Sequence, residues 1–143
     1  TELTVGDGFS GKPDAEPKHA ERLGLIRIVG TAVKPPLYPL NDGEGGTVIG
    51  SLATGKGAIT DVDRDVSRHH ARVFAQDGTW YVEGLGSTNG TVLLSGADMS
   101  STVVEAPRHA REGNAPHPPV SLCNGDIICL GATTRFLVMK LAM

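Results

Sequence analysis

The sequence predicts an all-β fold, a sandwich or barrel built from short antiparallel strands. Nineteen glycines and nine prolines interrupt the 143 residues, and such frequent punctuation favours short strands over helices. Turn signals recur at spacings of about 8–12 residues, as they do in sandwiches and barrels. No segment shows the sustained apolar period of an amphipathic helix, and no internal repeat is evident.

The first strands expected along the chain are short and interrupted. The apolar run Leu23–Val29 (LGLIRIV) is the first. A second, around Leu37–Leu40, carries Pro36 and Pro39, which would hold it at a sheet edge because proline has no N–H to donate to a ladder. A third run, GGTVIG, ends at Gly50, and the triplet AIT that follows is a minimal strand.

The clearest hairpin signal lies in the middle of the chain. The runs 71–76 (ARVFAQ) and 79–85 (TWYVEGL) flank the pair Asp77-Gly78. A D-G pair between two such runs predicts a type I′ turn, because glycine tolerates the positive φ that this turn requires. The second run also alternates inward and outward residues, as expected for a half-buried strand.

The C-terminal part predicts further strands around a long loop. Ala106–Pro119 contains four prolines and little apolar content, so we expect a surface loop there. Strands are expected on both sides of it, at 91–94 (TVLL), 100–105 (SSTVVE), 126–131 (DIICLG) and 134–142 (TRFLVMKLA).

Composition excludes several classes of protein. A net charge of −3 argues against a nucleic-acid-binding domain, which usually carries a basic surplus. No apolar run approaches the roughly 20 residues of a transmembrane helix. Cys123 and Cys129 lack metal or redox spacing, so we expect free thiols in a reducing, cytoplasmic compartment. Residues 1–22 are expected to be a flexible tail or linker, and residues 23–143 a monomeric domain of a larger protein.

Several motifs come close to enzymatic signatures but lack their context. The stretch 50–57 (GSLATGKG) is one residue from a P-loop, yet Gly57 replaces the hydroxyl that binds Mg²⁺, and AIT is a poor helix start. The stretch 84–90 (GLGSTNG) lacks the βαβ unit of a dinucleotide site. Ser67 precedes His70 by three residues without a nucleophile elbow, and the five histidines lack zinc spacing. We expect no enzyme, cofactor or metal.

Two polar loops offer a different chemistry. The stretches 66–71 (VSRHHA) and 85–91 (LGSTNGT) lie on either side of the predicted hairpin. If they meet at one end of a sandwich, their hydroxyls, Arg68 and Asn89 can face a single anion, since hydroxyl and guanidinium groups both donate hydrogen bonds. Taken alone, the second stretch is better explained as a β-turn whose Asn-Gly pair supplies positive φ.

Together these motifs resemble those of a forkhead-associated (FHA) domain. The resemblance rests on Gly50, on ITD at Ile59–Asp61, on VSRHHA, on 80–91 (WYVEGLGSTNGT) and on 124–131 (NGDIICLG), with matching order and spacing from about Leu23 to Leu141. It implies a β-sandwich of about eleven strands in two antiparallel sheets. It also implies an interaction module that binds phosphothreonine in partners phosphorylated by a Ser/Thr kinase, and not an enzyme.

The resemblance assigns roles to individual residues. Ser67 and Arg68 would contact the phosphate, Thr88 would hydrogen-bond it, and Asn89 would hold the peptide backbone beside the phosphothreonine. The residues expected to shape these loops without touching the ligand are Gly50, His70 and Gly90.

Three departures from the family pattern bear on binding. Ser51 stands where the family has its main phosphate-clamping arginine, Gly84 stands where an aspartate is usual, and the loop at 106–119 is longer than usual. The cations that could compensate are Lys56, Arg108 and Arg111. The alternative is a phospho-independent protein-interaction domain on a degenerate FHA scaffold.

Overall fold

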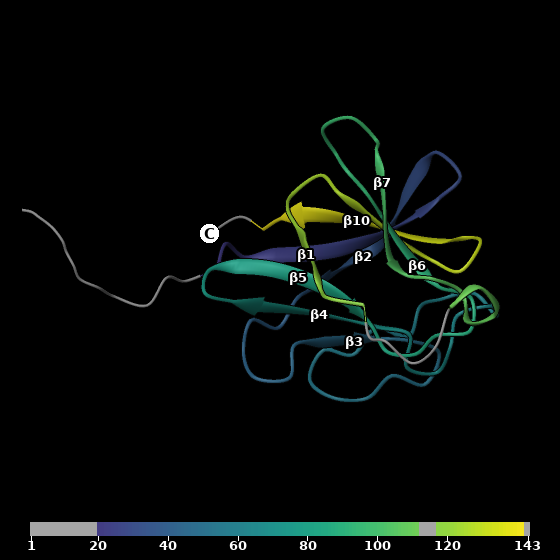
Figure 1. The fold of residues 1–143 in the computed structure, drawn as a ribbon. Helices are drawn as coiled ribbons and strands as arrows, with labels where there is room; N and C mark the ends of the chain where they lie inside the picture. Colours follow the sequence, from purple (N-terminus) through teal and green to yellow (C-terminus); the bar gives the residue numbers. More distant parts are fainter. Residues whose placement is uncertain (1–19, 112–116, 142–143) are drawn as a thin grey trace, which may run out of the picture.

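Ten strands of the described residues form two antiparallel sheets in a computed structural model of the protein, which describes residues 20–111 and 117–141 (Figure 1). The six-stranded sheet has the order β2-β1-β10-β9-β6-β7, and the four-stranded sheet has the order β3-β4-β5-β8. The strands are β1 (Leu23–Val29), β2 (Ala32–Pro39), β3 (Thr47–Ile49), β4 (Ala71–Gln76), β5 (Thr79–Gly84), β6 (Thr91–Leu94), β7 (Ser101–Glu105), β8 (Val120–Leu122), β9 (Ile127–Leu130) and β10 (Thr134–Lys140).

The core lies between the two sheets and follows from the alternation of the strands. In β5, Trp80 and Val82 are buried, whereas Tyr81 between them is partly exposed. They pack in one cluster with Leu25 of β1, Phe136 of β10 and other apolar residues of the facing sheet. Since burial of such side chains is worth about 1.5–3 kcal/mol each, this cluster is the main source of stability.

The expected all-β sandwich is confirmed, with differences in individual strands. The hairpin is a two-residue turn between Gln76 and Thr79, with φ of 52° at Asp77 and 82° at Gly78, as type I′ requires. The AIT triplet contributes only one isolated bridge, between Ile49 and Ile59. Strand β8 was not expected, because its three residues show no pattern of their own; it forms by pairing with β5.

The edges of the sandwich also follow the sequence. Strand β2 is at the edge of the six-stranded sheet, as its prolines predict, but it is longer than expected because Ala32, Val33 and Lys34 also pair with β1.

Before the first strand, the Glu21 carbonyl accepts a 2.6 Å hydrogen bond from the Trp80 indole. The fold therefore already includes the end of the expected tail, whose residues 1–19 lie outside the described residues.

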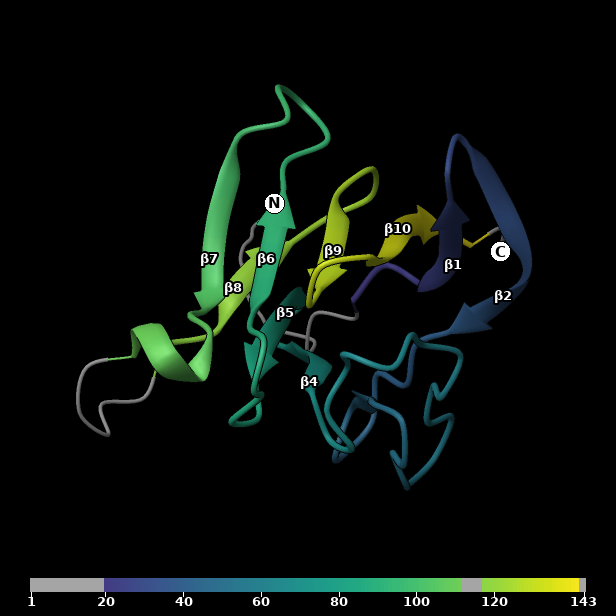
Figure 2. The ribbon, with the colours of Figure 1, turned by 90° about the vertical axis from the view of Figure 1, so that its right-hand side faces the viewer.

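Strand register brings four connections to one end of the sandwich. Ile49 pairs with Ala71, and Ala71 pairs with Gly84, so the loops 50–70 and 85–90 leave from the same end. The pairings of Thr91 with Glu105 and Leu130 add the start of the β7–β8 connection and the β9–β10 turn. Figure 2 shows the loops 50–70 and 85–90 at the lower side of the molecule.

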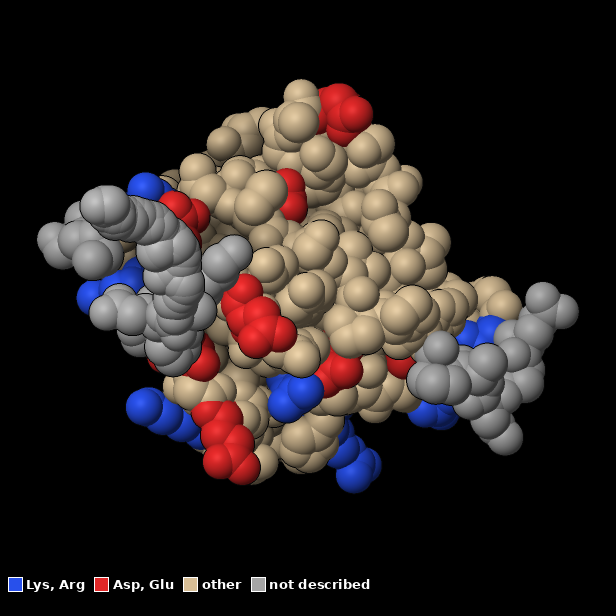
Figure 3. Space-filling model, turned by 60° about the vertical axis from the view of Figure 1, so that its left-hand side comes forward, with Lys and Arg blue, Asp and Glu red and all other residues tan. Residues whose placement is uncertain are grey.

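The described residues contain little helix, and their charged side chains are mixed on the face shown in Figure 3. Within the described residues, the one assigned helix is the 3₁₀ turn η2 (Arg108–Ala110), and no helix there has the length and apolar character needed to cross a bilayer. On the face drawn in Figure 3, acidic and basic side chains are interspersed around an uncharged surface. That face lacks the single-sign field typical of nucleic-acid binding.

Candidate functional site

Hydroxyl groups from two loops meet at this end of the sandwich. The backbone N–H of Thr88 donates to Ser67 Oγ at 3.0 Å, and that of Ser51 donates to the Ser67 carbonyl at 3.0 Å. Because Ser67 Oγ accepts from Thr88, its own proton remains available to a ligand. These residues lie in an open pocket lined by Ser51, Arg64, Val66, Ser67, Arg68, His69, Leu85, Gly86, Thr88 and Arg108.

His70 braces the loop that carries Ser67. Its ring is fully buried, Nδ1 accepts from the Ser67 N–H at 3.0 Å, and Nε2 lies 2.7 Å from the Gly90 carbonyl. Burial lowers the pKa of His70, although the Gly90 carbonyl opposes this shift. The ring is therefore neutral, with Nδ1 as acceptor and Nε2–H as donor, and it ties the two loops together.

Two glycines allow the loops to approach closely. A Cβ at Gly50 would overlap the Arg68 carbonyl oxygen and lie 2.8 Å from that of Ser67. Gly90 has φ of 84°, and a Cβ there would lie 2.8 Å from the Glu105 carbonyl oxygen. The structure thus gives both positions a packing reason for glycine.

An ion-pair network anchors the middle of the 50–70 loop, which carries Ser67, to the six-stranded sheet. Arg27 Nη1 lies 2.9 Å from Asp61, the last residue of the ITD motif, and Nη2 lies 2.6 Å from Asp63. The Thr133 hydroxyl and then the Arg27 guanidinium lower the pKa of Asp63. Tyr38 adds a 3.1 Å hydrogen bond to Asp61.

Glu105, which belongs to none of the sequence motifs, holds the second loop. Its buried carboxylate accepts hydrogen bonds from Gly86 N (2.9 Å), Ser87 N (2.8 Å) and Ser87 Oγ (2.6 Å). Burial alone would raise the pKa of Glu105, but the donors on Ser87 and Gly86 outweigh it and hold the pKa below its ordinary value. Nothing in the local sequence around Glu105 marks it; its partners are 18 and 19 residues away.

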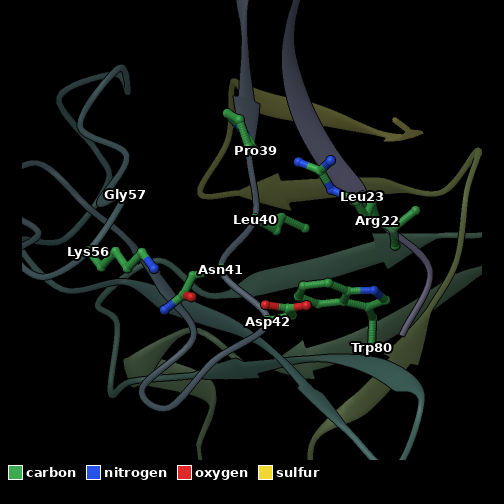
Figure 4. Close-up of a pocket in the computed structure, with 9 residues that line it drawn as sticks. All are labelled: Arg22, Leu23, Pro39, Leu40, Asn41, Asp42, Lys56, Gly57 and Trp80. Atoms are coloured by element: carbon green, nitrogen blue, oxygen red, sulfur yellow. The ribbon is translucent and has the colours of Figure 1, made fainter. Parts of the chain in front are cut away.

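The three candidate compensating cations lie in different places. Arg108 lines the pocket: its N–H donates to the Thr88 carbonyl at 2.9 Å, and its guanidinium donates to that of Gly86 at 3.3 Å. Arg111 instead pairs with Glu105 at 3.3 Å. Lys56 lines a separate pocket beside Trp80 (Figure 4).

The pocket holds two further basic residues that the motifs did not mark. Arg64 and His69 both line it, and their closeness to Arg68 in the sequence is the feature by which they could have been predicted.

Asn89 is exposed beside Thr88, and its side-chain amide donates to the Asp65 carbonyl at 2.8 Å, so it links the two loops. The arrangement suits an anion, because it gathers hydroxyl, backbone and guanidinium donors in one place.

Comparison with known proteins shows the family of this chain. The FHA domain family matches residues 47–131, more than half of the chain, and the chain belongs to that family. FHA domains are interaction modules and not enzymes.

A curated relative also matches much of the chain. FHA domain-containing protein At4g14490 of Arabidopsis thaliana is 33% identical over 90 residues, which cover 63% of this chain and 19% of that protein. The chain thus spans about a fifth of that relative's length.

Among solved structures, the FHA domain of human APLF, in complex with an XRCC1 bisphospho peptide, has a TM-score of 0.58 at 22% identity. The match covers 84% of this chain and 99% of that one. An FHA domain from work on phosphothreonine-dependent FHA domain interactions has a TM-score of 0.55 at 24% identity, covering 85% and 99%. At these identities the likeness concerns the fold.

Proposed function

We propose that this domain binds protein segments that contain phosphothreonine, and that the pocket around Ser67 receives the phosphate. The observation that carries the proposal is the meeting of Ser67, Arg68 and Thr88 in one pocket. Among the described residues, ten line it, of which four are arginine or histidine and none is a carboxylate. The positive charge of the arginines at this open pocket attracts a dianion.

The mechanism is capture without chemistry. Phosphorylation by a Ser/Thr kinase adds a charge of about −1.5 to −2 and strong acceptor oxygens to a threonine. The Ser67 and Thr88 hydroxyls and the Arg68 guanidinium replace the water around those oxygens with fixed donors. Asn89, already tied to the neighbouring loop, presents its side-chain carbonyl to a peptide N–H.

Arg108 supplies the charge that Ser51 lacks. Both residues line the same pocket, although they come from different connections. The hydrogen bond from the Arg108 N–H to the Thr88 carbonyl fixes the Arg108 backbone beside the pocket. The side chain can therefore reach the pocket without any further ordering of the backbone at this residue. The long β7–β8 connection, which distinguishes this chain from the family pattern, thereby contributes to binding.

The alternative is phosphate-independent binding on the same scaffold, favoured by Ser51 at the usual arginine position. The two readings separate in a titration of a degenerate phosphothreonine peptide library against its unphosphorylated counterpart, followed by single peptides from the bound fraction. We expect binding only to the phosphorylated form and a loss of at least tenfold, about 1.4 kcal/mol, in both Ser67→Ala and Asn89→Ala.

Ser121→Ala is the matched control, because Ser121 is an exposed serine in β8 away from the pocket lining. Equal binding of phosphorylated and unphosphorylated libraries would refute the proposal in favour of the alternative.

A further inference from the structure

Glu105 is a buried acid placed directly under the loop that carries Thr88. Only 7% of its surface is exposed, and its two oxygens accept three hydrogen bonds from Gly86 and Ser87. Ser87 Oγ in turn accepts from the Gly90 N–H at 3.1 Å. One carboxylate therefore organises the residues on both sides of Thr88 and Asn89.

Gly84 provides the space for this carboxylate. Gly84 is a regular strand residue paired with Ala71, and its backbone does not require glycine. A Cβ there would overlap the Glu105 carboxyl carbon and lie 2.5 Å from the Glu105 Cβ. The Glu105 side chain thus occupies the space that a side chain at position 84 would need. This contact packs β7 against β5.

Arg111 balances the charge of Glu105. Its Nη1 lies 3.3 Å from Glu105 Oε2 and donates to the Ala106 carbonyl at 3.2 Å. Arg111 does not line the pocket. A carboxylate so near a phosphate site would oppose a dianion, and a paired guanidinium reduces that opposition.

We propose that Glu105 is a positioning residue: it holds the amides of Gly86 and Ser87, and so the Thr88 donor, in the geometry that receives the ligand. Gly84 and Arg111 act through it, the first by leaving room and the second by neutralising it. The inference rests on the proposed phosphothreonine function, and it gives the unusual Gly84 of this chain a purpose.

The first test needs no ligand. In ¹⁵N-labelled wild-type protein, the amide signals of Gly86 and Ser87 should shift together as the pH falls, at a pH below the ordinary pKa of 4.5 for a glutamate. In Glu105→Gln this titration should vanish, whereas Glu83→Gln, on the outer face of β5 and paired with Arg72, should retain it. Amide signals that do not respond to pH, or that still respond in Glu105→Gln, would overturn the inference.

The second test measures phosphopeptide affinity. We expect Glu105→Gln to weaken binding by about tenfold, because the amide keeps one acceptor oxygen without charge and its NH2 group cannot accept from the remaining backbone donor. Made alone, Gly84→Asp should weaken binding, because the new side chain collides with Glu105. Combined with Glu105→Ala, the same substitution should improve binding, because the new carboxylate enters the space that the Glu105 side chain has left. A loss from Gly84→Asp of equal size in both backgrounds would contradict the proposal.

Arg111 supplies a third test that separates indirect from direct action. Arg111→Ala should weaken binding several-fold in the wild-type protein and have little effect in Glu105→Gln, where no charge remains to be balanced. Equal losses in both backgrounds would mean that Arg111 contacts the ligand itself. If the wild-type protein binds no phosphopeptide, the proposed function fails and the role of Glu105 in binding fails with it, whereas the amide titration still decides whether Glu105 holds the loop.

Discussion

Removal of the Arg108 side chain is the most direct test of how the proposed phosphate site works without an arginine at position 51. Arg108 lines the same pocket as Ser51, with its guanidinium 3.3 Å from the Gly86 carbonyl. If it clamps a phosphate, Arg108→Ala removes one charge-assisted contact. Arg108→Lys keeps the charge but loses the two-pronged geometry that suits phosphate oxygens.

The size of the effect follows from exposure. A charge-assisted hydrogen bond contributes about 1.5–3 kcal/mol net, and an exposed ion pair about 1 kcal/mol or less. Arg108 is exposed but anchored through its backbone to Thr88, so we take a value between these limits. A loss of about 1–2 kcal/mol corresponds to about 5–30-fold weaker binding.

The assay is calorimetric titration of a phosphothreonine peptide at two salt concentrations. Arg135→Ala is the matched control, because Arg135 donates to the Gly30 carbonyl at 3.4 Å in the same manner but from β10. We also expect Ser51→Arg to restore affinity in Arg108→Ala, and salt to weaken wild-type binding more than that of Arg108→Ala. Unchanged affinity in Arg108→Ala, with no gain from Ser51→Arg, would refute the reasoning.

Two further predictions concern stability. Burial lowers the pKa of His70 below its ordinary 6.5, so as the pH falls the unfolded chain takes up this proton before the folded protein does. The contribution of His70 to the free energy of unfolding is therefore fully present above pH 6.5 and decreases below it, by at most about 1.4 kcal/mol per pH unit for one proton. Urea denaturation from pH 8 to pH 5 checks this, and an identical slope in His70→Gln would contradict it. Asp61→Asn should cost about 1–3 kcal/mol, since it weakens a contact to the mostly buried Arg27, whereas Glu83→Gln, which breaks a more exposed pair, should cost less than about 1 kcal/mol. Equal losses in these two variants, measured by the same denaturation, would show that burial of Arg27 adds nothing.

The sequence by itself determined the features that depend on neighbouring residues. The Asp77-Gly78 pair predicts its hairpin, because two positive φ angles are a local demand that this pair meets. The prolines of β2 place that strand at an edge, because a missing N–H is a property of the residue. The loop motifs around Ser67 and Thr88 indicated the family for the same reason, since each is a continuous stretch with its own geometry.

Tertiary structure decided which distant side chains reach the site. The sequence offers Lys56, Arg108 and Arg111 as equivalent cations, yet only Arg108 lines the pocket with Ser67. Likewise, no local pattern pairs Glu105 with Gly84, which are 21 positions apart in the sequence but meet where β5 faces β7. Such meetings depend on strand register and on the packing of two sheets, because the energy of a long-range contact is set by where the whole fold places both partners and not by either stretch alone.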